Sequence, residues 1–194
     1  MTNHLQQSQR AIGALFFTAF GALWLLGWVA ATFPWAPAAL LPLALATAAL
    51  AYCCLRQYHW HRARAIDDDN TPARQRRIRR QFHLVNGGQW LAVVIVISVL
   101  NHTGHGVWLL PAIIAIVGLH CLPLAVIFHS LPHAVTGLAL LALALFYPQW
   151  AAGGAADTIG ALGAGLILWC SAAWAIRPTP ASFLWLQDDG LNDI

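Results

Sequence analysis

The residues best suited to chemistry are polar side chains inside otherwise apolar stretches. Asn86 and Gln89 are three positions apart, so they share one face of a helix, and Trp90 follows directly. His120 precedes Pro123, and a proline leaves the carbonyl four positions before it without a helical partner. Polar groups are costly in hydrocarbon and often mark functional sites. The sequence therefore predicts a ligand pocket of Asn86, Gln89, Trp90 and His120. In the alternative interpretation, the two amides hydrogen-bond His120 and the freed carbonyl, which fastens two helices together.

A second set of residues has the donor atoms of a soft-metal site. Its members are predicted at similar depth on inward-running helices, and they are His120, Cys121, Cys170 and Cys54. No CxxC spacing supports a metal, and cysteine is also a common small packing residue. Haem would need histidines on facing helices at matched depth, which His120 and His133 would have to supply. We therefore expect no cofactor, and a metal- or haem-binding redox protein is the third hypothesis.

Composition determines the solvent of the chain. The 194 residues are 59% hydrophobic and only 9% charged, against about 25% charged in a soluble domain. A single soluble core cannot hide so much apolar surface from water, so most of the chain is expected in lipid. Alternating polarity, the mark of a membrane barrel, is missing, which leaves α-helices. The fold class is therefore predicted to be an all-α membrane protein.

Six apolar runs have a length suited to the bilayer, for which roughly 17–25 residues are needed. They cover residues 11–32, 37–55, 84–102, 107–128, 131–147 and 157–176. We expect six transmembrane helices in three hairpins, which form a single membrane domain over residues 1–194. Ser130 and Asp157 are the predicted N-caps of the last two helices. Small residues such as Gly13, Gly21, Gly160 and Ala164 allow close helix approach, within the bundle or between copies in a homo-oligomer.

The arginines predict the orientation. Residues 56–83 hold eight of the ten basic residues, and basic loops remain in the cytoplasm. With six spans, Arg10 and Arg177 fall on the same side, so both termini and the tail at 178–194 are expected inside. Residues 56–66 are expected to extend the second helix, and Thr71-Pro72 to start the third, which gives a cytosolic arginine-rich hairpin. Its candidates for anionic lipid headgroups are Arg74, Arg76, Arg77, Arg79 and Arg80. Nucleic acid is not expected, because no folded basic domain is present.

Several activities lack their usual residues. Asp157 stands at the end of the last apolar run, and no carboxylate lies in the interior of any run, which disfavours a proton- or sodium-coupled transporter. The sequence has no HExxH, GxSxG, Ser–Lys or P-loop motif, so the common membrane hydrolases and ATP-driven pumps have no support. We do not expect an enzyme.

Residues 84–147 also carry a resemblance to other proteins. The segments VNGGQW, VLNHTG, IVGLHCLPLA and HAVTG are similar to those of a group of small, uncharacterised bacterial inner-membrane proteins with six helices. The resemblance implies a bacterial inner-membrane protein. Two functions then compete: a passive transport or small-ligand-binding protein using the pocket, and a non-catalytic interaction or scaffold protein using the arginine hairpin.

Overall fold

The protein folds entirely as helices in the residues that the structure describes. The computed structural model describes residues 4–33, 37–64, 72–128 and 130–177. Within them are six α-helices and two short 3₁₀ helices, and none of these residues forms a strand. The α-helices are α1 (His4–Thr32), α2 (Pro37–Arg62), α3 (Pro72–His102), α4 (Leu109–Ile127), α5 (Leu131–Trp150) and α6 (Ile159–Ala175). The 3₁₀ helices η1 (Gly106–Trp108) and η2 (Gly154–Ala156) precede α4 and α6. An all-α fold is thus confirmed.

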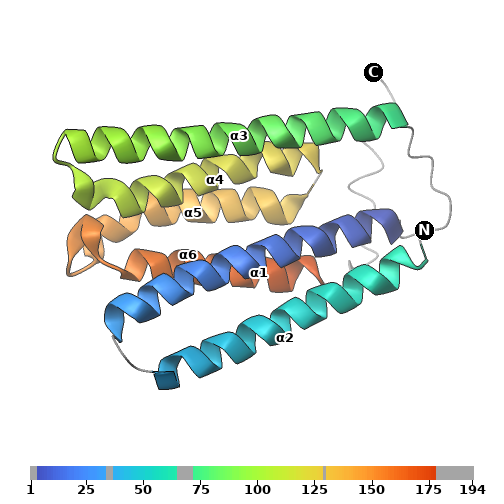
Figure 1. Cartoon of the computed structure of the whole chain (residues 1–194), viewed down its shortest axis with the longest axis horizontal. Helices are drawn as coiled ribbons and strands as arrows, with labels where there is room; N and C mark the ends of the chain where they lie inside the picture. The colour runs from blue at the N-terminus through green and yellow to red at the C-terminus, as the bar shows by residue number, and fades with distance from the viewer. Residues whose placement is uncertain (1–3, 34–36, 65–71, 129, 178–194) are drawn as a thin grey trace.

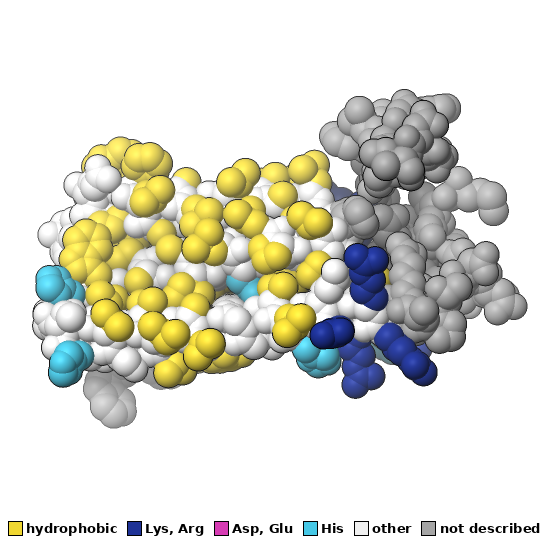
Figure 2. Space-filling view, turned by 90° about the horizontal axis from the view of Figure 1, so that it is seen from above, with side chains coloured by type: hydrophobic (Ala, Val, Ile, Leu, Met, Phe, Trp, Pro, Cys, Tyr) yellow, Lys and Arg dark blue, Asp and Glu magenta, His cyan; other side chains and the backbone are white. Residues whose placement is uncertain are grey.

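Five helices, α1 to α5, are long and apolar enough to cross a membrane, as in a multi-pass membrane protein. The sixth predicted span corresponds to α6, an apolar helix of only 17 residues. Apolar side chains are spread over the face of the molecule shown in Figure 2, and arginines gather at one end of it. The second helix extends to Arg62 and the third starts at Pro72. The turn between these two extensions lies outside the described residues.

The helices form a series in which α2 and α3 lie at the two edges. Helix α1 packs against α2 and α6, α6 packs against α5, α5 against α4, and α4 against α3 (Figure 1). The fully buried side chains Ile114, Leu140 and Leu168 belong to α4, α5 and α6. In the described residues α3 contacts only α4 and η1. The core therefore lies among α1, α4, α5 and α6, and α3 is attached to it through α4 alone.

Glycines permit the closest helix crossings. A Cβ atom added at Gly137 of α5 would lie 2.8 Å from the carbonyl oxygen of Gly118 on α4, and one at Gly118 would lie 2.9 Å from that of Gly137. At the crossing of α1 and α6, a Cβ at Gly165 would lie 2.5 Å from Leu25 Cγ and 3.0 Å from the Gly21 carbonyl oxygen. Both crossings leave no room for a side chain, which is how small residues bring membrane helices together.

Hydroxyl groups and one indole add polar contacts between the same helices. Thr136 Oγ1 donates to Ser171 Oγ at 2.6 Å, and this bond joins α5 to α6. Trp169 Nε1 donates to the carbonyl of Thr18 at 3.1 Å, which joins α6 to α1. Interhelical bonds of this kind contribute about 0.6–2 kcal/mol each in membranes. They supplement the close packing at the glycines.

The two predicted caps behave differently. Ser130 occupies the N-cap of α5, but its hydroxyl makes no bond to the helix backbone and pairs with a side chain instead. Asp157 lies one residue before the N-cap of α6. Its carboxylate accepts the N–H of Ile159 through Oδ1 and the N–H of Gly153 through Oδ2, both at 2.9 Å. Asp157 therefore caps the start of α6 and also closes the turn before it.

Asp157 gives the protein a pH-dependent contact at this end. The backbone N–H groups of Ile159 and Gly153 hold the pKa of Asp157 below its ordinary value of 3.8. Because the folded pKa is the lower one, the stabilisation is complete above about pH 4 and is lost as the pH falls through the folded value. We expect the amide NMR shifts of Gly153 and Ile159 to titrate together, with a midpoint below 3.8. Asp157→Ala should lower the unfolding temperature at neutral pH and make no difference at a pH below both values. An undiminished difference in strong acid would contradict this role.

Candidate functional site between α3 and α4

The predicted shared face of Asn86 and Gln89 is present on α3. The half-buried positions of this part of the helix include Phe82, Val85, Asn86, Gln89 and Val93. They recur every three or four residues, so they form one stripe along the helix. Since α4 is the long helix that α3 contacts, the stripe with both amides lies on the α4 side.

Trp90 lies at the edge of this face. It is four positions after Asn86, so the two side chains lie about 40° apart around the helix. The Trp90 indole is 59% exposed, whereas Asn86 and Gln89 are half-buried. That Trp90 lines the pocket stays a prediction. An exposed tryptophan on an apolar surface is suited to contact with lipid.

His120 lies opposite Val85, next in the chain to Asn86. The imidazole interacts with the backbone of Val85, so α3 and α4 meet at this point. The Nδ1 atom of this ring is buried and has no hydrogen-bond partner among the described residues. Among the described residues, neither Asn86 nor Gln89 forms a hydrogen bond with the His120 ring. The alternative in which the amides fasten His120 to α3 is therefore not what the structure shows.

His133 forms a second buried polar centre near the first. Its Nδ1 pairs with Ser130 Oγ at 2.8 Å, its ring centroid lies 4.8 Å from that of Phe17, and its Cε1 packs against Gly13. It is also close enough to His120 for the two rings to interact electrostatically. His133 thus connects α5 to α1. The sequence suggested His133 only as a haem ligand, and its packing role depends on contacts with α1 that no local pattern reveals.

The four residues considered for a metal site are not gathered. Cys121 is buried at the α4–α5 crossing, where it lies beside Gly137. Cys54 is buried against α1, with Sγ 3.8 Å from Thr18 Oγ1, and Cys170 is exposed. No group of three or more histidine, cysteine or acidic side chains suited to a metal occurs in the described ranges.

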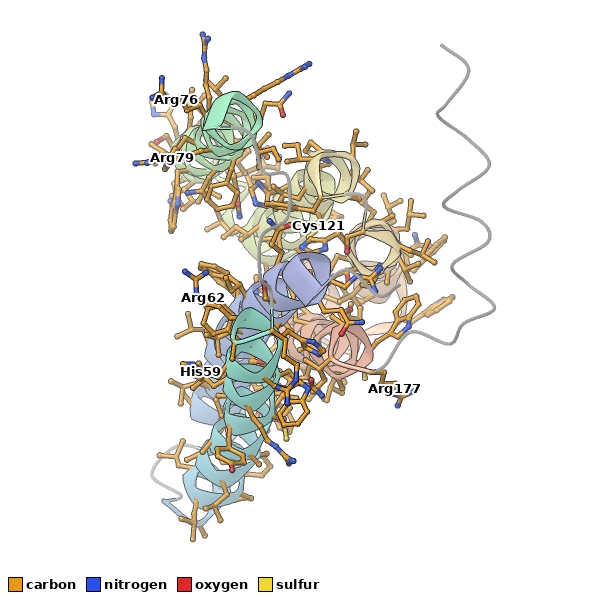
Figure 3. All side chains as sticks on the ribbon, turned by 90° about the vertical axis from the view of Figure 1, so that its right-hand side faces the viewer. His59, Arg62, Arg76, Arg79, Cys121 and Arg177 are labelled. Carbon is orange, nitrogen blue, oxygen red and sulfur yellow. The ribbon has the colours of Figure 1, made fainter. Side chains whose placement is uncertain are left out.

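The predicted lipid-binding arginines lie on the first turns of α3. Arg76, Arg77, Arg79 and Arg80 are all exposed. Figure 3 shows Arg76 and Arg79 pointing away from the bundle, at the end where Arg62 and Arg177 also lie. Arg74 belongs to the same helix, but its side chain is outside the part that the structure describes. These arginines therefore face outward at one end of the molecule.

Comparison with known proteins adds no relative to this description. The chain matches no protein-family model, no curated protein and no solved structure. The function must therefore be argued from the residues alone.

Proposed function

We propose that this chain is a bacterial inner-membrane protein that binds a small polar solute between α3 and α4 and allows its passive movement. In this proposal the chain crosses the membrane six times, with α6 as the sixth span and the arginine-rich end in the cytoplasm. The observation that carries the proposal is the buried Nδ1 of His120, which has no partner among the described residues. A buried polar atom left unpaired costs about 1–3 kcal/mol. A ligand or water that supplies the missing hydrogen bond accounts for such an atom.

The surrounding residues indicate the class of solute. Asn86 and Gln89 lie on the α4 side of α3 and can both donate and accept hydrogen bonds. No carboxylate lies within the apolar spans, so the site offers no fixed negative charge to a cation. Amide and imidazole groups match a neutral solute with hydroxyl or amide groups. The absence of an acid from the spans is also what supports passive movement, since ion coupling usually uses one.

The position of α3 suits a site that must open. Helix α3 contacts only α4 and η1 in the described structure, and most of its surface is apolar and exposed. Elements with few buried contacts separate at the lowest free energy. Movement of α3 relative to α4 would expose His120 without disturbing the core among α1, α4, α5 and α6.

The proposal is tested with glycerol and urea as probes. In proteoliposomes, the wild-type protein should speed osmotic swelling with at least one of them relative to protein-free vesicles. His120→Leu should return the rate to that of protein-free vesicles. The control His102→Leu alters an exposed histidine at the far end of α3 and should keep the wild-type rate. Binding is followed separately by the His120 imidazole NMR signal, which should shift on addition of the same probe. Swelling indicates transport, a shift alone indicates binding, and the absence of both rejects the proposal.

Stability distinguishes a ligand site from a structural contact. Because His120→Leu removes an unpaired buried nitrogen but also the contact of the ring with the Val85 backbone, it should cost little or no stability while abolishing the solute effect. A histidine kept for packing or fastening would instead lose stability on replacement. The unfolding free energy of both leucine variants in the same bicelles gives the comparison.

The arginine hairpin supports a second candidate function, a non-catalytic interaction or scaffold protein. The favouring observation is that Arg76, Arg77, Arg79 and Arg80 are all exposed. A polybasic segment beside a membrane attracts anionic lipid or an acidic partner by about 1 kcal/mol per arginine. Two sets of variants distinguish the candidates. Neutral replacements of these four arginines should abolish a scaffold function and leave solute movement unchanged. His120→Leu should abolish solute movement and leave a scaffold function unchanged.

A further inference from the structure

A second polar feature lies away from α3, at the arginine-rich end of the bundle. The first turns of α1 and the last turns of α2 and α6 enclose a partly open cavity of about 130 Å³. Its polar lining residues are Gln7 and Arg10 from α1, Gln57 and His61 from α2, and Arg177 just after α6. Small and aliphatic side chains complete the wall. Figure 3 views this end of the molecule and shows Arg177 at the end of α6.

The lining residues are cationic or hydrogen-bonding. Two of them are guanidinium groups, which carry a positive charge at all physiological pH values and have five N–H donors each. The two glutamine amides add donors, and His61 adds a ring nitrogen. No acidic side chain lines this cavity among the described residues. Arg10 and His61 also interact with other groups of the chain, and the several donors of a guanidinium can serve two acceptors at once.

Helix dipoles do not cancel this positive character. The C-terminal ends of α2 and α6 meet the cavity, and each is equivalent to roughly half a negative charge. The N-terminal part of α1 contributes the opposite sign. Two full guanidinium charges therefore exceed the helix contribution, so the cavity favours an anion.

The size of the cavity indicates which anion. Water takes about 30 Å³ per molecule in the liquid, so 130 Å³ holds roughly four waters. A phosphate group fits in this space. Arginine forks match phosphate oxygens in geometry as well as charge.

We propose that this cavity binds a phosphate group, either that of an anionic phospholipid headgroup or free phosphate. The apolar part of the wall, including Ala175 and Ile176, is next to the membrane-crossing part of the bundle and suits the glycerol end of a lipid. Basic pockets between membrane helices bind phospholipid headgroups in this way. The proposal rests on no part of the site between α3 and α4.

The test uses the full-length protein in neutral detergent, with thermal unfolding as the measure of binding. The probes are phosphatidylglycerol, phosphatidylcholine as the zwitterionic lipid, and inorganic phosphate. Each arginine beside an anionic group contributes about fivefold in affinity, so the double variant Arg10→Gln/Arg177→Gln should lose roughly 25-fold. With inorganic phosphate as the probe, the matched control Arg76→Gln/Arg79→Gln removes the same charge from the open surface of α3 and should lose far less affinity, because solvent and salt screen it.

A second variant keeps the proposal falsifiable where the double variant does not fold. Gln57→Glu keeps the size of the side chain and places a carboxylate in the cavity, so it should abolish phosphate binding. Stabilisation by phosphatidylglycerol alone identifies the lipid as the source, and stabilisation by inorganic phosphate identifies the free anion. The proposal is overturned if neither probe stabilises the wild type more than phosphatidylcholine does. It is equally overturned if the α3 control loses as much affinity as the cavity variants.

Discussion

Gly137→Ala should destabilise the protein by about 1–2 kcal/mol, although alanine is the better helix former. The new Cβ would lie 2.8 Å from the Gly118 carbonyl oxygen and 3.2 Å from Cys121 Cβ. The first atom belongs to a helix backbone, so no side-chain rotation relieves the clash and α4 must move away from α5. Overpacking of this kind costs about 1–3 kcal/mol and occasionally more. It outweighs the roughly 1 kcal/mol that alanine gains over glycine in a helix.

The α4–α5 crossing also has matched controls within the chain. A Cβ atom at Gly87 of α3 or at Gly27 of α1 meets nothing within 4 Å. Gly87→Ala and Gly27→Ala should therefore leave stability unchanged or raise it, as measured by unfolding in bicelles. Gly118→Ala, on the other side of the contact, should resemble Gly137→Ala. Equal stability of all four variants would mean that the helices do not touch at these glycines.

The helices themselves could be predicted from the sequence because their signals are local. The uninterrupted apolar run at residues 11–32 and Thr71-Pro72 determined the end of α1 and the start of α3 almost to the residue. Residues 56–66 were predicted to extend the second helix, and α2 continues into this segment as far as Arg62. Hydrocarbon leaves the backbone no alternative to a helix, so length and polarity suffice for this part of the fold.

The arrangement of the helices could not be predicted in the same way. Most faces of these helices are apolar, so the side that meets another helix does not differ from the side that meets lipid. Trp90, for example, is on the same side of α3 as Asn86 by spacing, yet its indole is 59% exposed. Asn86 and Gln89 were placed correctly relative to each other because a spacing of three is a property of one helix. Their relation to His120 depends on how α3 lies on α4, which the sequence does not encode locally.

His133→Ala should have the second large effect, a loss of about 2–4 kcal/mol. The substitution removes the ring that packs on Phe17 and Gly13 of α1, and it leaves the buried Ser130 hydroxyl without its partner. Replacement of a buried ring by alanine costs about 3–5 kcal/mol in soluble cores. Part of that cost of about 3–5 kcal/mol arises because the ring is exposed to water when a soluble protein unfolds. A membrane protein unfolds within lipid, so this part is smaller and the expected loss is lower.

Two further variants separate the contributions of His133. Ser130→Ala removes only the hydrogen bond and should cost about 1 kcal/mol, so the rest of the His133→Ala effect belongs to packing between α5 and α1. His102→Ala, at an exposed position, should change stability by less than about 0.5 kcal/mol. If His133→Ala cost no more than His102→Ala, the ring would not join α5 to α1. Because His133 also lies near His120, its loss should alter the His120 NMR signal, whereas Ser130→Ala should alter it less. A change in the His120 signal for His133→Ala alone would show that the ring of His133, and not its hydrogen bond to Ser130, determines the surroundings of His120.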